Sequence, residues 1–103
     1  MPKTSNIVNI TESQFQQSVI DLARAKGWLV YHTWRSDNSA PGFPDLTMVR
    51  RERLVFAELK VNSNKPTPAQ EQWLTALAAV QSVDTVQVYV WTPDDWAEIE
   101  ATL

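Results

Sequence analysis

Three charged residues in the middle of the chain have the types and spacing of a metal-dependent hydrolytic site. Asp45, Glu58 and Lys60 lie within GFPDLTMVRRERLVFAELK, whose other residues are those of two short apolar strands. If these strands form a hairpin that turns at Arg51 and Glu52, paired positions have numbers that sum to 103, and Asp45 falls opposite Glu58. Side chains alternate along a strand, so Lys60 shares the face of Glu58.

Two carboxylates that face each other in a hairpin repel, and the repulsion has to be relieved. One carboxylate could take a proton, or a divalent cation could lie between the two. Oxygen ligands suit Mg²⁺ or Mn²⁺, and Mg²⁺ commonly binds one or two carboxylates together with substrate phosphates. A water held by such an ion can attack a phosphodiester, and Lys60 could position it or offset negative charge. The alternative is ordinary surface charge, because single acids near strand ends and E-x-K pairs are usually solvated.

The remaining segments predict the elements that would hold these strands. Thr11 and Gln14 form a capping-box pattern that opens a helix ending at Gly27, and Thr67 and Gln70 repeat the pattern for a helix that runs to about residue 80. Strands are expected over 28–34, 45–50, 53–60 and 84–91, and a short last helix over 92–103. Both faces of the central hairpin are largely apolar, so we expect helices on both sides of the sheet.

The core prediction depends on the aromatic residues and on one stripe of each long helix. The residues expected in the core are Phe15, Val19, Leu22, Ala23, Trp28, Trp34, Trp73, Leu74, Leu77, Ala78 and Trp91. Trp96 could lie in the core or at a dimer surface.

Composition is that of one globular domain. The chain has 103 residues, 44% of them hydrophobic and 20% charged, and it has no cysteine for a disulfide or a thiolate metal site. It has no apolar run that suits a signal peptide or a membrane span, so we expect a cytoplasmic protein that is not secreted. The organisation we expect is a flexible arm over residues 1–10 and a single domain over 11–103.

The net charge of −3 speaks weakly against a nucleic-acid partner, but the charge is unevenly distributed. Residues 1–82 hold all nine Lys and Arg with seven acids, whereas residues 83–103 hold five acids and no base. A basic surface over the first four-fifths of the chain, or scattered solvated charge, fits this pattern.

The residues in the hairpin resemble the signature of the PD-(D/E)xK nuclease superfamily, with Pro44 and Asp45 as PD and Glu58, Leu59 and Lys60 as ExK. A fuller set of segments is similar to the VRR-NUC (virus-type replication-repair nuclease) branch and its small stand-alone members: TESQFQQSVIDLA, GWLVYHTW, SAPGFPDL, FAELK, TPAQEQWLTAL and VYVWTPDDW. The resemblance covers nearly all of residues 11–103. It implies a restriction-endonuclease-like α/β fold with an αβββαβ core, a mixed four-stranded sheet flanked by helices, and a short C-terminal helix.

The resemblance also implies roles for the hairpin residues. Asp45 and Glu58 would be metal ligands for Mg²⁺ or Mn²⁺, and they would act in catalysis together with Lys60, the catalytic lysine. The backbone carbonyl of Leu59 would complete part of the metal shell.

Five further residues have both a functional and a structural interpretation. Glu12 would be a first-helix acid that reaches the metal, although an acid at a helix start is favoured by the helix dipole alone. Gln70 resembles a catalytic glutamine, and the capping box explains it equally well. His32 is either a packed side chain or a contact to the site or to DNA. Ser39 and Gly42 could let a phosphate approach the backbone near the hairpin, or they are simply loop residues.

The function that the resemblance implies is a Mg²⁺- or Mn²⁺-dependent endodeoxyribonuclease. Its relatives are similar to enzymes that resolve branched DNA such as four-way (Holliday) junctions, so we expect branched DNA as substrate and a homodimer that presents two sites to two strands. The alternatives are a less selective DNase and a non-catalytic DNA-binding or assembly module of the same fold. Candidate DNA contacts, each also explicable as solvated charge, are Arg35, Ser39, Arg50, Arg51, Arg53 and Lys65.

Overall fold

The computed structural model describes residues 10–34, 39–82 and 84–103. Apart from residue 10, the arm expected at the start of the chain lies outside the described residues, and so does Arg35. The elements are α2 (Glu12–Ala25), β1 (Leu29–His32), β2 (Leu46–Arg50), β3 (Arg53–Leu59), α3 (Pro68–Ala79), β4 (Val86–Trp91), a 3₁₀ turn η1 (Pro93–Asp95) and α4 (Trp96–Thr102). No helix in these ranges is long and apolar enough to cross a membrane.

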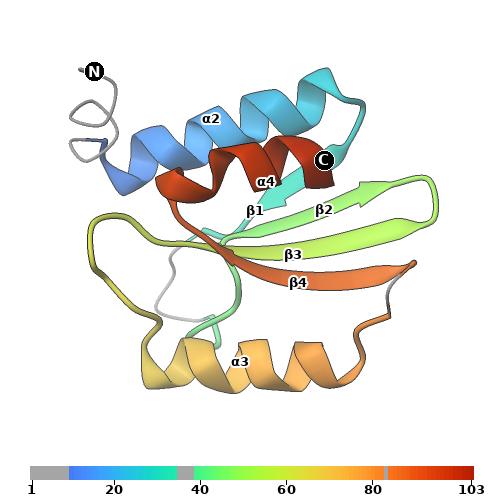
Figure 1. Cartoon of the computed structure of the whole chain (residues 1–103). Coiled ribbons are helices and arrows are strands. Elements are labelled where there is room, and N and C mark those ends of the chain that lie inside the picture. Colours follow the sequence, from blue (N-terminus) through green and yellow to red (C-terminus); the bar gives the residue numbers. More distant parts are fainter. Residues whose placement is uncertain (1–9, 35–38, 83) are drawn as a thin grey trace.

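The four strands form one mixed sheet in the order β1-β2-β3-β4. β1 and β2 are antiparallel, as are β2 and β3, whereas β3 and β4 run parallel and are connected through α3. Helices α2 and α4 cover one face of the sheet and α3 covers the other (Figure 1). The predicted α/β class, the mixed sheet with helices on both sides and the short C-terminal helix are therefore confirmed.

The central hairpin has the predicted register. Leu46 pairs with Ala57 and Arg50 pairs with Arg53, so paired numbers sum to 103 along the whole of β2. The turn contains Arg51 at a φ of 56°, a left-handed conformation that tight hairpin turns require and that residues other than glycine and asparagine rarely adopt. The turn residues are therefore unfavourable for a tight hairpin. The register is kept because one set of apolar side chains has to lie under α2 and α4.

The predicted helix ends are also confirmed, because each is specified by a local hydrogen-bond motif. Thr11 with Gln14, and Thr67 with Gln70, form complete capping boxes at the starts of α2 and α3. Gly27, at a φ of 91°, follows the last turn of α2. The amides of Gly27 and Trp28 donate to the carbonyls of Arg24 and Ala23, which is the Schellman arrangement.

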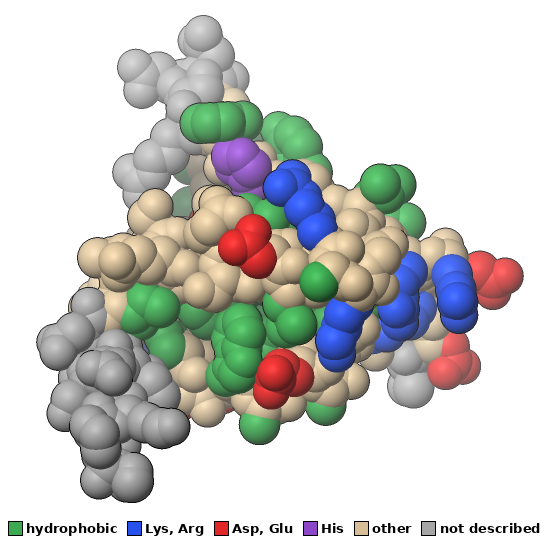
Figure 2. Space-filling view, turned by 90° about the horizontal axis from the view of Figure 1, so that it is seen from above, with side chains coloured by type: hydrophobic (Ala, Val, Ile, Leu, Met, Phe, Trp, Pro, Cys, Tyr) green, Lys and Arg blue, Asp and Glu red, His purple; other side chains and the backbone are tan. Residues whose placement is uncertain are grey.

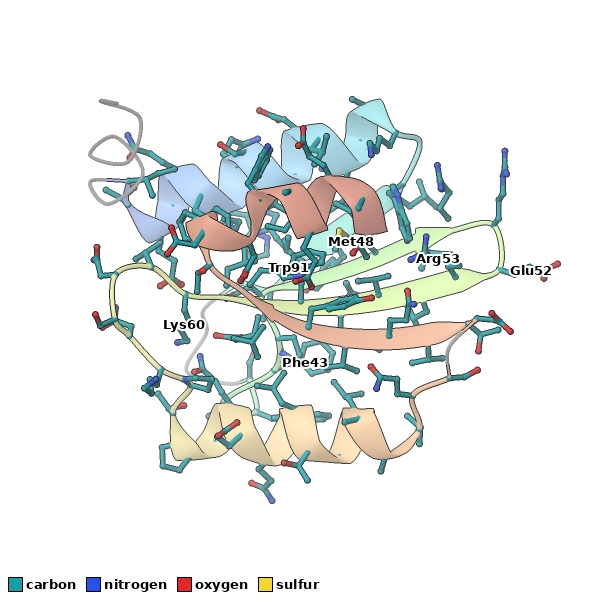
Figure 3. All side chains as sticks on the ribbon, viewed as in Figure 1. Phe43, Met48, Glu52, Arg53, Lys60 and Trp91 are labelled. Atoms are coloured by element: carbon teal, nitrogen blue, oxygen red, sulfur yellow. The ribbon has the colours of Figure 1, made fainter. Side chains whose placement is uncertain are left out.

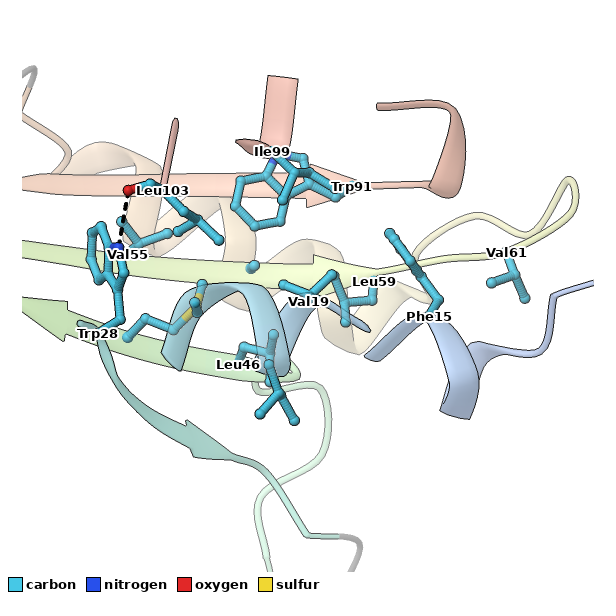
Figure 4. Close-up of a cluster of buried hydrophobic side chains, with 14 residues drawn as sticks. Phe15, Val19, Trp28, Leu46, Val55, Leu59, Val61, Trp91, Ile99 and Leu103 are labelled. Carbon is cyan, nitrogen blue, oxygen red and sulfur yellow. Dashed lines mark hydrogen bonds between the residues drawn. The ribbon is translucent and has the colours of Figure 1, made fainter. Parts of the chain in front are cut away.

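The main core lies between the sheet and the pair α2 and α4 (Figure 4). Alternate residues of β2 and β3 point into it and are fully buried, and they meet Phe15, Val19 and Ala23 of α2 and Ile99 of α4. The opposite face is less tightly covered. Of the residues predicted to be buried in α3, Leu74 is buried, Trp73 and Leu77 are half-buried, and Ala78 is exposed, because α3 contacts the sheet along a narrow stripe.

The tryptophans show where the core prediction was wrong. Trp28 and Trp91 are buried as expected, and Trp96 is half-buried against the core. Trp34 was predicted to be buried, but 70% of it is exposed. Strand β1 ends at His32, so Trp34 lies beyond the part of the sheet that the helices cover.

We expect Trp28→Ala to lower the free energy of unfolding by about 3–5 kcal/mol, because it removes a buried indole from the core. The indole also donates from Nε1 to the carbonyl of Leu103 at 3.2 Å, and only 3% of Trp28 is exposed. Trp34→Ala is the matched control and is expected to change the free energy by less than about 0.5 kcal/mol. Urea denaturation followed by circular dichroism measures both, and equal losses would contradict the burial described here.

Candidate metal and catalytic site

The candidate site lies at one end of the sheet, where β2 begins, β3 ends and α3 begins (Figure 1). Asp45 directly precedes β2, and the hairpin register, continued by one pair, sets it opposite Glu58. Lys60 follows the last residue of β3 and extends from the strand end toward α3, while Glu52 and Arg53 lie at the opposite end of the hairpin (Figure 3). The sequence therefore predicted correctly which residues the hairpin brings together.

Asp45 is held by hydrogen bonds from both neighbouring strands. Its Oδ2 accepts from the backbone amide of Leu59 at 2.8 Å. On the other side, the amide of Thr33 donates to the carbonyl of Asp45 at 2.8 Å, and the Thr33 hydroxyl donates to the carbonyl of Pro44 at 2.7 Å. These bonds fix the backbone of Asp45 and aim its carboxylate at the end of β3, next to Glu58.

Glu58 is a buried carboxylate in an unfavourable electrostatic position. Only 1% of it is exposed, and apart from the ion pair with Lys60 its oxygens have no hydrogen-bond partner among the described residues. Burial, followed by the negative charge of Asp45, raises the pKa of Glu58 from 4.5 to about 7. Lys60, whose Nζ lies 3.3 Å from Oε2, lowers the pKa of Glu58 and so opposes this rise. The negative charge of Glu12 raises the pKa, and its contribution is the smallest.

The donor set fits a divalent cation. A buried carboxylate whose oxygens accept no hydrogen bond can accept a metal ion instead, and the second acid beside it adds further oxygen ligands. In the described part of the chain, no three side chains of His, Cys, Asp or Glu gather closely enough to form a metal cluster. Asp45, Glu58 and the Leu59 carbonyl would therefore form the protein's share of the shell, which suits Mg²⁺ or Mn²⁺ because these ions retain waters.

Glu12 and Gln70 lie at the starts of the two long helices. Glu12 is exposed in the first turn of α2, and its charge reaches Glu58 only weakly, so its role as a ligand stays a prediction. Gln70 forms the capping box, in which its Oε1 accepts from the amide of Thr67 at 2.8 Å. Its catalytic role also stays a prediction.

Within the described residues, the arginines proposed to contact DNA lie around the turn at the far end of the hairpin. Arg50 donates to the carbonyl of Lys26 at 2.9 Å, and Arg53 donates to the carbonyl of Thr102 at 3.0 Å. Both guanidinium groups lie over the ring of Trp28, at 5.2 and 5.0 Å from its centroid. Figure 2 shows that basic side chains on the α2 and α4 face lie mostly toward this end of the molecule. Both arginines therefore have a structural explanation independent of DNA.

The remaining candidates are the exposed DNA contacts, one of which is Arg51 in the hairpin turn itself, together with the histidine and Gly42. Ser39, Arg51 and Lys65 are exposed, so their proposed contacts stay predictions. His32 is half-buried, and its ring lies 4.5 Å from the ring of Trp34, centroid to centroid. Gly42, for which either phosphate access or a plain loop role was left open, lies against α3: a Cβ there would be 2.4 Å from the carbonyl oxygen of Ala69.

Two residues near the site were missed by the sequence analysis. Thr33 anchors Pro44 and Asp45, and Trp73 donates from Nε1 to the carbonyl of Pro41 at 3.1 Å. Both contacts join parts of the chain that are distant in sequence. No local spacing signals them.

Comparison with known proteins supports the fold. No protein-family profile and no curated protein matches the sequence. A solved structure described as a VRR_NUC domain superposes with a TM-score of 0.66 and 23% sequence identity, and the match covers 85% of this chain and 91% of that chain. The chain has the VRR_NUC domain fold. At this identity the likeness concerns the fold, so the roles of the residues at the end of the sheet have to rest on their geometry.

Within this VRR_NUC fold, the raised pKa of Glu58 predicts an unusual pH dependence of stability in the metal-free protein. Between pH 4.5 and about 7, native Glu58 keeps a proton that the unfolded chain releases. Raising the pH through this window therefore favours unfolding, by up to about 3 kcal/mol. Urea unfolding in EDTA over the window measures the loss, and Glu58→Gln is expected to remove it. A stability that rises through this window, or the same slope in Glu58→Gln, would contradict the burial of this carboxylate.

Proposed function

We propose that the chain is a Mg²⁺- or Mn²⁺-dependent DNA endonuclease. The observation that carries the proposal is the buried Glu58 carboxylate, which accepts no hydrogen bond from a described donor and lies beside Asp45 and Lys60 at the end of a VRR_NUC fold. A site of this kind has little structural use, because a buried and poorly compensated carboxylate destabilises the fold that contains it. Its retention is explained if the two acids hold a cation.

Each residue would have a separate part in phosphodiester hydrolysis. A bound divalent cation supplies charge neutralisation of the phosphate and activation of a water. Asp45 and Glu58 would hold it, and the Leu59 amide keeps Asp45 oriented. The Lys60 ammonium, on a side chain that is only 11% exposed, would stabilise the negative charge that develops on the phosphate oxygens.

The finer part of the proposal is that the substrate is branched DNA and that two copies act together. One small chain carries one site, and a two-fold dimer would present two sites to two strands. β1 is an edge strand, and it exposes 76% of Leu29 and 59% of Tyr31 beside the exposed Val49. These apolar side chains, together with the outer edge of β1, which pairs with no further strand among the described residues, form a surface that a second copy would cover. The alternatives are a less selective DNase and a non-catalytic DNA-binding or assembly module.

We expect the purified protein to nick a labelled four-way junction in Mg²⁺ or Mn²⁺ but not in EDTA, and to cut linear duplex and single strands more slowly. Asp45→Asn should abolish cutting, and Lys60→Met should lower the rate by about 10²-fold or more, because it removes a charge that acts in the transition state. Glu52→Gln, which changes an exposed acid at the remote turn, is the control and should cut normally.

The outcomes separate the candidate functions. Equal rates on all three substrates would support the less selective DNase. Junction binding without metal-dependent cutting would support the non-catalytic module, and a normal rate in Asp45→Asn would overturn the assignment of the site.

The dimer makes a separate prediction about mass in solution. Leu29→Glu places a charge on the exposed edge of β1, and we expect it to convert a dimer into a folded monomer. Light scattering coupled to size-exclusion chromatography measures the mass. Val80→Glu, at an exposed apolar position after the end of α3, is the matched control. A monomeric wild type, or a dimer that survives Leu29→Glu, would overturn this interface.

A further inference from the structure

The loop that leads into Asp45 is fastened to helix α3. Trp73, half-buried in the middle of α3, donates from Nε1 to the carbonyl of Pro41 at 3.1 Å. This bond joins residues that are 32 positions apart in the sequence. It is a contact between a helix side chain and the loop backbone, so it fixes the path of the loop rather than the position of one side chain.

A second contact brings the backbones themselves together. Gly42 has a φ of 91°, and a Cβ built there would lie 2.4 Å from the carbonyl carbon and oxygen of Ala69 and 2.8 Å from the amide nitrogen of Gln70. Such distances leave no room for any side chain, so the loop can lie against the first turn of α3 only because residue 42 is glycine. The loop and the start of α3 are therefore in direct backbone contact.

Phe43 completes the attachment. Its ring packs edge-on against Trp73, with centroids 5.0 Å apart, and edge-on against Phe56 of β3, at 5.9 Å. Figure 3 shows Phe43 between the sheet and α3. Phe56 precedes Glu58 by two residues and points to the same face of the sheet. Phe43 thus links the loop to the strand that carries the other acid.

We propose that Trp73 is a positioning residue for Asp45. It acts through a clasp that consists of the Trp73–Pro41 hydrogen bond, the Gly42–α3 backbone contact and the packing of Phe43. The inference rests on the proposed function for its relevance to a metal site.

The physical reason is that little freedom remains between the clasp and Asp45. Pro44 alone separates Phe43 from Asp45, and Pro44 is buried with its φ fixed by the ring. When residues 41–43 are held against α3, the position of the Asp45 backbone is therefore held as well. The carboxylate then reaches the Leu59 amide at 2.8 Å, and a small shift of the loop would move it away from that amide and from Glu58.

The Leu59 amide gives a readout that needs neither metal nor activity. Its proton is bound by the Asp45 carboxylate, so its hydrogen-exchange rate, measured by NMR in EDTA, reports the placement of Asp45. Trp73→Phe keeps a ring against Phe43 and removes the N–H donor, and Gly42→Ala pushes the loop off α3. In both variants we expect the Leu59 amide to exchange about tenfold faster. We also expect Mn²⁺, titrated by calorimetry, to bind about tenfold more weakly.

Leu74→Ala is the matched control. It removes a buried side chain of the same helix and loosens the packing of α3, but it leaves the clasp residues in place. We expect it to lower the melting temperature while leaving Leu59 exchange and Mn²⁺ affinity within about twofold of the wild type, because the clasp contacts persist. If Leu74→Ala changes both readouts as much as Trp73→Phe does, the effect is general loosening and the proposal is overturned. Wild-type values in both clasp variants would overturn it too.

A measurement on the unmodified protein covers the case in which the variants do not fold. With rising urea below the unfolding transition, the Trp73 indole proton and the Leu59 amide proton are expected to become exchangeable together, as one opening unit. Independent opening would overturn the proposal. If the clasp variants change Leu59 exchange while the wild type binds no Mn²⁺, the positioning inference stands and the proposed metal-dependent function fails.

Discussion

The structure depends on one electrostatic constraint. The fold buries the carboxylate of Glu58 beside a second acid and supplies too little positive charge to compensate it. Glu58 lies on the central strand β3, where residues facing both sides are covered, so its charge cannot reach water. The single ammonium of Lys60 offsets part of the cost, yet the pKa of Glu58 still rises. A buried and poorly compensated carboxylate is costly to a fold, and the proposed function would explain why one is present at the end of a well-packed sheet.

The packing of the rest of the fold offsets the free-energy cost of burying Glu58. One face of the hairpin contributes fully buried apolar side chains to the core under α2 and α4, and this face stabilises the fold. The other face, under α3, is more loosely covered and carries Glu58 and Lys60 at its end. Because side chains alternate, the same two strands serve both purposes, and the register that buries Leu46 and Ala57 also sets Asp45 against Glu58.

Features specified by neighbouring residues could be predicted from the sequence. The capping boxes at Thr11 and Thr67 involve residues three apart, and the hairpin register follows from a two-residue turn at Arg51 and Glu52. Exposure of Trp34 could not be predicted, because it depends on where β1 ends relative to the helices above it. The contact of Trp73 with Pro41 and the stacking of Arg50 and Arg53 on Trp28 depend on tertiary packing between distant segments, which a periodicity cannot reveal.

The topology of the sheet also bears on the sequence of events during folding. Asp45 and Glu58 belong to one hairpin, and such elements close within about 1–10 μs, whereas the parallel pairing of β3 with β4 must wait for the whole crossover through α3. We therefore expect the two acids to meet before α3 docks, while water still surrounds them. Burial is the largest cause of the raised pKa of Glu58, so we expect its proton uptake to accompany the docking of α3 and not the closing of the hairpin.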